Sequence, residues 1–172
     1  MKSFSLQATL SILEKMKWHQ FHIVHSDDMY SIQVAKFLMQ LSSFHDNFCA
    51  LSMEQYTSFK KLGSDYDDTT LNVNQDVIAS VLSDSKTVAR ILVILHKSSV
   101  KNFLESVNEY IQMNNVTGVE MLFSQLLTHE EYKLISKETT KIYSLSAVTE
   151  NTKSFEEYWQ NQIHRVKVSK LR

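Results

Sequence analysis

The sequence predicts an α/β domain with a mostly parallel sheet, because helical and strand patterns alternate along the chain. The most informative stretch runs from Val88 to Ser124. Its first part is a near-continuous apolar run ending at Leu95, which is short and typical of a strand buried on both faces. A helical stripe and a second strand follow. Two buried strands joined by a helix form a βαβ unit, which is expected to cross over in the right-handed sense.

The helix of this unit is predicted to begin at a serine N-cap, Ser98 or Ser99, because a serine side chain can accept a hydrogen bond from the first turn. Its apolar residues form one stripe at helical spacing: Val100, Phe103, Leu104, Val107 and Ile111. Gly118 then separates the helix from the second strand. The apolar positions of that strand are Val119, Met121 and Phe123.

Helices and strands also alternate on both sides of this unit. Before it, the patterns predict helices at Ser5–Met16, Tyr30–Phe44 and Gln75–Leu82 and strands at Phe21–His25 and Phe48–Met53. After it, they predict a helix at Glu130–Ser136, a strand at Ile142–Val148 and a helix at Ser154–Ile163, capped by Ser154. The long central helix has its predicted stripe at Val34, Phe37, Leu38 and Leu41.

This order predicts a doubly wound sheet of about five strands in flavodoxin-like order, with helices on both faces. Four strand residues are expected in its core: Ile23, Ile91, Val93 and Met121. The 172 residues, 43% of them hydrophobic, fit one domain. We assign residues 1–163 to a single α/β lobe and 164–172 to a basic C-terminal tail, interpreted as solvated.

Composition excludes several classes of function. A formal net charge of −1 gives no reason to expect nucleic acid as a partner. No stretch is long and apolar enough for a membrane span or a secretory signal, so the isolated chain is expected to be soluble. The two glycines, Gly63 and Gly118, are far apart, which excludes a dinucleotide-binding fingerprint, a Walker loop and a nucleophile elbow. No cofactor is therefore expected.

Histidines and acidic residues do not form a predicted metal site. His19, His22 and His25 alternate between the two faces of a strand and cannot converge on one ion. The acidic segment from Asp65 to Asp68 lacks the glycine and terminal glutamate of an EF-hand, and a solvated loop is the preferred interpretation.

Two further features are candidate chemical sites. Asp27 and Asp28 follow the first strand, where a phospho-receiver domain would hold magnesium. The central strand, however, ends in His96 and Lys97 instead of a phosphoacceptor aspartate, which argues against that class. Cys49 is the only cysteine, has no adjacent base and is expected to be a small buried residue on a strand. No nucleophile, base and oxyanion donor can be named together, so an enzyme is not expected.

Five segments are informative through their order and spacing: SFSLQATLSILEKMKWHQFHIVHSDDMYS, FCALS, TVARILVILHKSS, GVEMLFSQ and IYSLSAVTENTKSFEEYW. The first is similar to an entry helix, with a tryptophan before a strand and a loop of the form S/T-x-x-x-Y-G. The second is similar to a strand carrying a cysteine, and the third to a strand written A-R-V-I-V-I-F. The fourth is similar to a strand ending in S-D, and the fifth to a later strand before a helix that begins S-F-x-x-Y. Together they resemble the second lobe of a Venus-flytrap extracellular domain. This type I periplasmic-binding-protein fold occurs in metabotropic glutamate receptors and other class C G protein-coupled receptors, and the resemblance covers nearly the whole chain.

The resemblance implies a ligand-binding lobe of a signalling receptor that closes like a clamshell, without catalysis. Tyr30 matches the tyrosine that packs over the ligand, and Ser26 and Asp27 match the rim beside it. Gln125 stands where amino-acid-sensing members have an aspartate for the ligand's ammonium group. The partners implied are the first lobe of the same receptor, a second receptor protomer in a dimer, and a small-molecule ligand.

The departures from the family pattern concern the ligand. Besides Gln125, Ser31 replaces the usual glycine and Lys2 an acidic residue. Losing a carboxylate removes a charge-assisted hydrogen bond of roughly 1.5–3 kcal/mol, so negligible affinity for free amino acids is expected. The first lobe also has no counterpart in this chain. The alternatives are a lobe of an N-methyl-D-aspartate-type receptor amino-terminal domain, a lobe of a receptor guanylyl cyclase, and a free-standing flavodoxin-like interaction module.

The resemblance also implies a compartment, the extracellular side of the plasma membrane. Cys49 matches a cysteine that forms a disulfide with another domain in the resembling receptors. Asn115 begins an N-x-T acceptor triplet and would be glycosylated, which requires an exposed side chain. Finally, the segments 26–31, 96–98 and 124–128 each leave the carboxyl end of a predicted strand. They are expected to cluster at one edge, with Tyr30 and Gln125 facing the same space.

Overall fold

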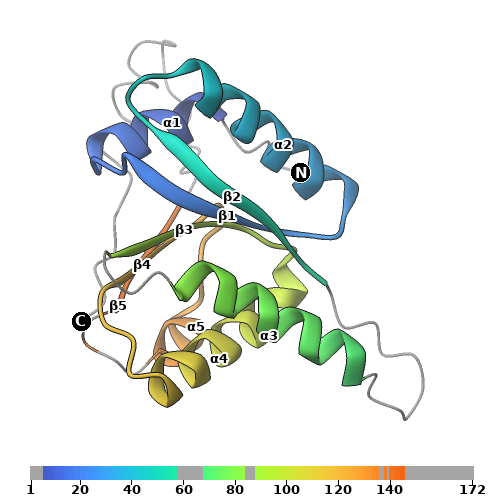
Figure 1. The fold of residues 1–172 in the computed structure, drawn as a ribbon. Coiled ribbons are helices and arrows are strands. Elements are labelled where there is room, and N and C mark those ends of the chain that lie inside the picture. Colours follow the sequence, from blue (N-terminus) through green and yellow to red (C-terminus); the bar gives the residue numbers. More distant parts are fainter. Residues whose placement is uncertain (1–5, 58–67, 84–87, 136–137, 139, 146–172) are drawn as a thin grey trace, which may run out of the picture.

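The computed structural model describes residues 6–57, 68–83, 88–135, 138 and 140–145. It contains one sheet of five parallel strands in the order β2-β1-β3-β4-β5 (Figure 1). The strands are β1 (Gln20–Ser26), β2 (Cys49–Tyr56), β3 (Ala89–Ile94), β4 (Val119–Phe123) and β5 (Thr140–Ser144). This confirms the predicted α/β class and the flavodoxin-like strand order.

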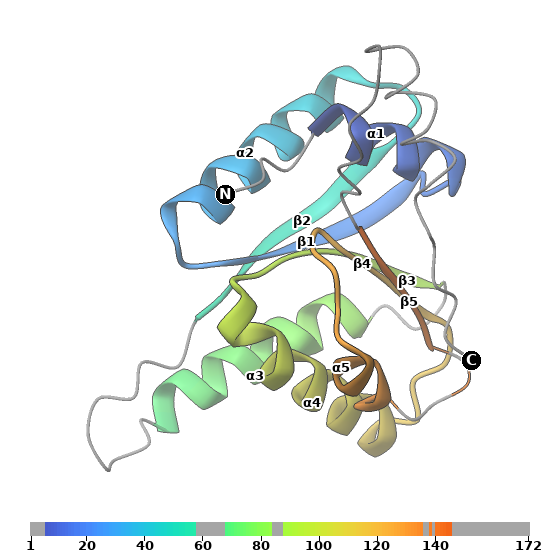
Figure 2. The same cartoon turned by 180° about the vertical axis from the view of Figure 1, so that it is seen from behind.

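Helices cover both faces of the sheet. On one face lie α1 (Leu6–Lys15) and α2 (Met29–Phe44), and on the other lie α3 (Asp68–Leu82), α4 (Lys97–Met113) and α5 (His129–Lys133). Figures 1 and 2 show these two layers from opposite sides. Because β1 leads into a helix on one face and β3 into a helix on the other, the sheet is doubly wound.

The central strands are buried on both faces, as the continuous apolar run predicted. On β3, Ile91 and Val93 pack into the core beneath α3 and α4, whereas Leu92 and Ile94 pack into the core beneath α1 and α2. The four predicted core residues and the whole α4 stripe are completely buried. Each such side chain contributes about 1.5–3 kcal/mol of hydrophobic stabilisation.

The predicted cap of α4 is wrong by two to three positions. The N-cap is His96, whose backbone is extended and whose ring nitrogen accepts from the Ser98 N–H. Ser98 and Ser99 lie inside the first turn, and Ser99 is buried. Serine is the commoner N-cap residue, so the sequence predicted a serine at this position. In the structure, α4 begins shortly after the end of β3, which places His96 at the N-cap.

The predicted stripe of α2 is also partly wrong. Phe37 is 45% exposed. The residues that α2 buries are Ser31, Val34, Ala35, Leu38 and Ser42. Three of these residues, Ser31, Ala35 and Ser42, have small side chains that let α2 lie close to the sheet. The ring of Phe37 is then turned outward.

Several boundaries also differ from the predictions. The helix α3 begins at Asp68, before the predicted Gln75, and Val88 precedes β3 instead of opening it. The strand β5 is Thr140–Ser144. Other predicted features lie outside the described residues: Lys2, Ser5, the loop residues 60–67, Ser136, the strand residues 146–148, the helix Ser154–Ile163 and the tail 164–172.

Candidate binding edge of the sheet

The carboxyl ends of the parallel strands meet at one edge, which is where open α/β sheets bind ligands. Within this edge, β1 and β3 are neighbours whose following helices go to opposite faces. In open α/β sheets, ligands bind beside such a topological switch point. Ser26 closes β1, and His96 follows β3.

A hydrogen bond crosses the switch point. The His96 backbone N–H donates to the Ser26 hydroxyl oxygen over a nitrogen–oxygen distance of 2.5 Å. Ser26 is fully buried. Its hydroxyl therefore ties the end of β1 to the start of α4 and is committed to the scaffold of the edge.

Asp28 caps α2 on the β1 side of the switch point. Its carboxylate accepts from the Ser31 N–H at 3.0 Å and from the Ser31 hydroxyl at 2.7 Å. Partial burial alone would raise the pKa of Asp28, but these two hydrogen bonds and the nearby His96 ring hold it below its ordinary value. Asp28 is thus an ionised helix cap.

His96 caps α4 on the β3 side of the switch point. Its Nδ1 lies 2.8 Å from the Ser98 hydroxyl and 3.4 Å from the Ser98 backbone nitrogen. The ring nitrogen therefore serves a backbone N–H in the first turn of α4, where no partner is available within the helix.

The loop after β4 is fastened to β3. The Gln125 Nε2 donates to the Leu95 carbonyl oxygen at 2.9 Å, and the Ser124 N–H donates to the Val93 carbonyl at 3.0 Å. The half-buried Gln125 amide therefore satisfies a strand-end carbonyl. A carboxylate at this position could not donate that bond, which gives a structural reason for an amide here.

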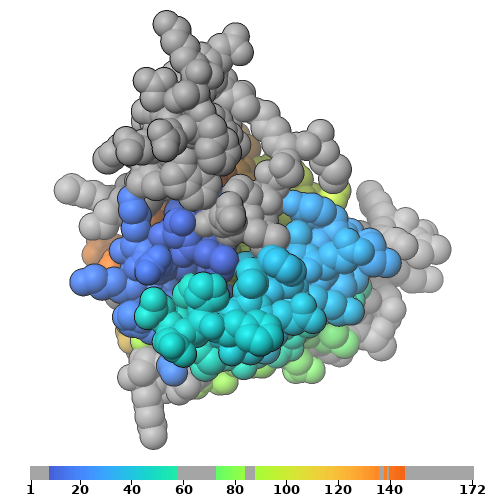
Figure 3. Space-filling view, turned by 90° about the horizontal axis from the view of Figure 1, so that it is seen from above, coloured from blue at the N-terminus to red at the C-terminus, as the bar shows by residue number. Residues whose placement is uncertain are grey.

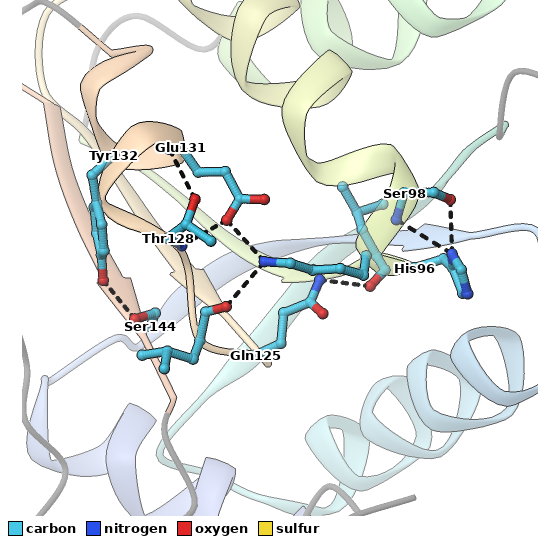
Figure 4. Close-up of polar contacts among 10 residues, drawn as sticks. His96, Ser98, Gln125, Thr128, Glu131, Tyr132 and Ser144 are labelled. Carbon is cyan, nitrogen blue, oxygen red and sulfur yellow. Dashed lines mark hydrogen bonds and ion pairs between the residues drawn. The ribbon is translucent and has the colours of Figure 1, made fainter.

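Lys97 connects this loop to α5. Its Nζ lies 2.8 Å from the Glu131 Oε2 and 3.3 Å from the Leu126 carbonyl oxygen (Figure 4). Glu131 also forms a capping box with Thr128, in which each side chain accepts from the other's backbone N–H. Partial burial would raise the pKa of Glu131, but Lys97 and Thr128 lower it overall.

The network extends as far as β5. The Tyr132 hydroxyl and the buried Ser144 hydroxyl are 2.5 Å apart (Figure 4). We use the name carboxyl-edge network for the polar contacts of residues 26–31, 95–98, 124–132 and 144. It joins the ends of β1, β3, β4 and β5 into one rim.

The three predicted loop segments do meet at this edge. Contacts from Ser26 to His96 and from Gln125 to Leu95 join them directly. Asp27 is half-buried, and Tyr30 is 43% exposed in the first turn of α2. No contact that joins Tyr30 to Gln125 is described, so their shared orientation stays a prediction.

The sequence patterns above do not predict the roles of His96, Lys97 and Glu131. One signal was available, because Thr128-x-x-Glu131 is the sequence pattern of a capping box. The contact of Lys97 with Glu131 had no local signal, since the two residues are 34 positions apart. The partner of the His96 cap, Ser98, is only two residues away, but histidine is not among the common N-cap residues.

A second polar cluster lies away from this edge, around Glu120 on β4. Arg90, Glu120 and Lys141 are aligned across three neighbouring strands. The Glu120 carboxylate is 3.2 Å from the Arg90 Nε and 3.3 Å from the Lys141 Nζ, and it accepts from the Trp18 indole N–H at 3.1 Å. Burial raises the pKa of Tyr143 beside it, and the Glu120 charge raises it further. We call these residues the Glu120 cluster.

Cys49 is exposed, which corrects the expectation of a buried residue. It is the first residue of β2, which is an edge strand and has a neighbouring strand on one side only. It helps to line a pocket of about 440 Å³ at the amino ends of the strands, together with His19, His45, Asp46 and Arg90. This pocket lies at the other end of the strands from the carboxyl-edge network.

The histidines in and just before the first strand have separate partners. His19 Nδ1 lies 2.9 Å from the Asn47 carbonyl oxygen, His22 Nδ1 lies 2.8 Å from the Ser52 hydroxyl, and the buried His25 contacts the Ser26 carbonyl. Among the described residues, no group of three or more His, Cys, Asp or Glu side chains could hold a metal ion.

Asn115 is exposed just beyond the end of α4, with a left-handed backbone at φ 51°. An exposed asparagine is accessible to modification. Within the described part of the chain, no helix is both long and apolar enough to cross a membrane.

Neither comparison with known proteins provides a family. No protein-family model matches the chain, and no curated protein matches it.

Proposed function

We propose that this chain is a ligand-binding-domain lobe of a cell-surface receptor of the metabotropic glutamate receptor-like type, which senses its ligand by closing against a partner lobe. The main support is the carboxyl edge at the β1/β3 switch point, where three loops from separate strands form one braced rim. A rim of this kind supplies one wall of a cleft, and a second lobe would supply the other.

The ligand is proposed not to be a free amino acid. Gln125 stands where the resembling receptors have an aspartate, and its amide is committed to the Leu95 carbonyl. Tyr30, exposed at the rim, remains the side chain proposed to pack over a ligand, with the half-buried Asp27 beside it. The fully buried Ser26, which matches the rim in the resembling receptors, is proposed to support the rim through its hydrogen bond to His96. Calorimetry on the purified chain should show millimolar or weaker binding of free amino acids, and a micromolar dissociation constant would contradict this part.

An extracellular location and a glycoprotein character belong to the same proposal. The exposure of Asn115 supports glycosylation, and the exposure of Cys49 supports a disulfide with another domain. When the parent transcript is expressed in animal cells, glycosidase treatment should shift the mobility of the product. Thr117→Ala should abolish the shift while keeping Asn115, and a shift that survives it would place the glycan elsewhere.

The most direct test is the parent transcript itself. A first lobe encoded upstream, or a cysteine-rich and membrane-spanning region downstream, would support the receptor lobe. A transcript that encodes this domain alone would favour the free-standing interaction module instead. The same flanking regions would distinguish class C receptors from N-methyl-D-aspartate-type receptors and receptor guanylyl cyclases.

We propose no catalytic activity. At the carboxyl edge, the Ser98 hydroxyl lies 2.8 Å from a His96 ring nitrogen, which is the spacing of a nucleophile and its base. That ring nitrogen, however, caps α4, and Ser98 lies in the first helical turn. A fluorophosphonate probe should therefore label the native chain no more than the Ser98→Ala variant. Labelling that depends on Ser98 would instead support an enzyme.

A further inference from the structure

The pocket at the amino ends of the strands is a second place where a ligand can be bound. Its volume of about 440 Å³ falls within the range of about 300–1,000 Å³ that is usual for small-molecule sites. The residues that line it come from the starts of the first three strands and from the turn after α2: His19, His45, Asp46, Phe48, Cys49 and Arg90. Figure 3 looks onto the α1 and α2 layer, where the turquoise surface that leads into β2 borders the blue surface of the N-terminal segment.

Arg90 is held in the pocket wall by the Glu120 cluster. Its Nε donates to the Glu120 carboxylate at 3.2 Å, and Glu120 is held in turn by Trp18 and Lys141. The two terminal nitrogens of the Arg90 guanidinium have no hydrogen-bond partner among the described residues. Two parallel N–H donors of this kind match the two oxygens of a carboxylate or phosphate group.

Histidine rings form another part of the pocket wall. The His19 Nδ1 lies 2.9 Å from the Asn47 carbonyl oxygen. Because a carbonyl can only accept, Nδ1 carries the hydrogen, and Nε2 is the nitrogen that is left for another partner. The His45 ring is stacked on Phe48, with 4.8 Å between the ring centroids and 20° between the planes. The pocket therefore combines a fixed cation with a flat aromatic surface.

We propose that this pocket binds a small organic anion, with its carboxylate or phosphate group on Arg90 and its body against the stacked His45 and Phe48. The opposing charge in the lining, Asp46, is exposed, so solvent screens it. The Arg90 side chain is only 31% exposed and is screened less. This inference rests on the pocket alone and not on the proposed receptor function, which concerns the other end of the strands.

Binding is tested by calorimetry on the purified chain at low salt, with Cys49 kept reduced. The probes are phenyl phosphate and benzoate, and phenol is their uncharged match. At least one anion should bind with a dissociation constant below about 1 mM, and phenol should bind at least tenfold more weakly. The tighter of the two anions identifies the preferred charged group. No binding of either anion at about 10 mM, or equal binding of phenol, would overturn the proposal.

Matched substitutions test the role of Arg90. Arg90→Gln removes the guanidinium and should weaken binding of the tighter anion at least tenfold, because a charge-assisted hydrogen bond is lost. Lys141→Gln removes the other cation beside Glu120, which is not among the described residues that line the pocket, and should leave the affinity unchanged. Asp46→Asn removes the opposing charge and should tighten binding. Equal weakening by Arg90→Gln and Lys141→Gln, or weaker binding by Asp46→Asn, would overturn the proposal.

Cys49 reports the location of the bound anion without any substitution, so the test does not depend on the folding of a variant. It is the only cysteine of the chain, it is exposed, and it lines the same pocket. Iodoacetamide, which is uncharged, alkylates the thiolate and releases iodide. A saturating concentration of the tighter anion should slow this alkylation at least threefold, whereas phenol should not. An unchanged rate in the presence of the bound anion would place it elsewhere and would overturn the proposal.

Discussion

The helix caps of the carboxyl-edge network and the Glu120 cluster differ in the sequence distance between their partners. At the carboxyl edge, the helix caps join residues two or three positions apart, as in Asp28 with Ser31. In the Glu120 cluster, one carboxylate accepts from Trp18 and Arg90, which are 102 and 30 residues away. Local caps fix where a helix begins. Long-range contacts fix which strands are aligned.

The difference also predicts how each region responds to mutation. A lost cap removes one or two hydrogen bonds, and solvent can replace part of them because the helix end is accessible. The Glu120 carboxylate serves three donors at once and is 15% exposed. Its removal leaves several donors without an acceptor, which costs more.

The largest effect is expected for Glu120→Ala. The variant leaves the Trp18 indole N–H and the Arg90 guanidinium without their acceptor, and we expect the free energy of unfolding to fall by about 2–3 kcal/mol. Urea denaturation followed by tryptophan fluorescence measures this change. Glu109→Ala, at an exposed position of α4, serves as the control and should stay within about 0.5 kcal/mol. Equal losses in both variants would show that the Glu120 cluster does not stabilise the sheet.

Gln125→Glu tests whether position 125 can carry the carboxylate of amino-acid sensors. The new carboxylate faces the Leu95 carbonyl that Gln125 now satisfies, so we expect a loss of about 1–2 kcal/mol in the free energy of unfolding. Calorimetry should also detect no gain of amino-acid binding. A variant as stable as the native chain that binds glycine or glutamate would contradict the scaffold role of Gln125.

Asp28→Ala should reduce the free energy of unfolding by about 1 kcal/mol, the usual effect of removing an N-cap. The start of α2 should then fray, which hydrogen exchange at Ser31 would reveal as faster exchange. Asp46→Ala, at an exposed residue just beyond α2, is the matched control. Unchanged protection at Ser31 would exclude a capping role for Asp28.

The smallest effect concerns pH. Because the folded-state pKa values of Asp28 and Glu131 are lowered, their contribution is present above their ordinary values of 3.8 and 4.5 and is lost as the pH falls through the folded-state values. The stability difference between the native chain and an Asp28→Asn/Glu131→Gln variant should be constant near pH 7 and should shrink below about pH 4. A difference that grows on acidification would contradict ionised caps.

Much of the carboxyl edge could be predicted from strand ends alone. In a parallel sheet, loops after neighbouring strands must meet, so the convergence of 26–31, 96–98 and 124–128 followed from the apolar runs before them. The bond from Gln125 to Leu95 could not be predicted, because the same glutamine could equally have pointed to a ligand. The prediction that Cys49 is buried was wrong for a related reason. The sequence pattern identifies the strand that carries Cys49, but it does not show that this strand lies at the margin of the sheet.

By itself, the sequence determined the α/β class, the order of the elements and the residues at the centre of the core. These follow from apolar periodicity, which is a local property: the run through Ile91 and Val93 suits a strand covered on both faces, and the α4 stripe suits one helix face. Only the tertiary structure decided that α2 turns Phe37 outward, that the Ser26 hydroxyl accepts from the His96 N–H and that Trp18 donates to Glu120. Each of these depends on how closely elements distant in sequence approach one another, and no local pattern encodes that distance.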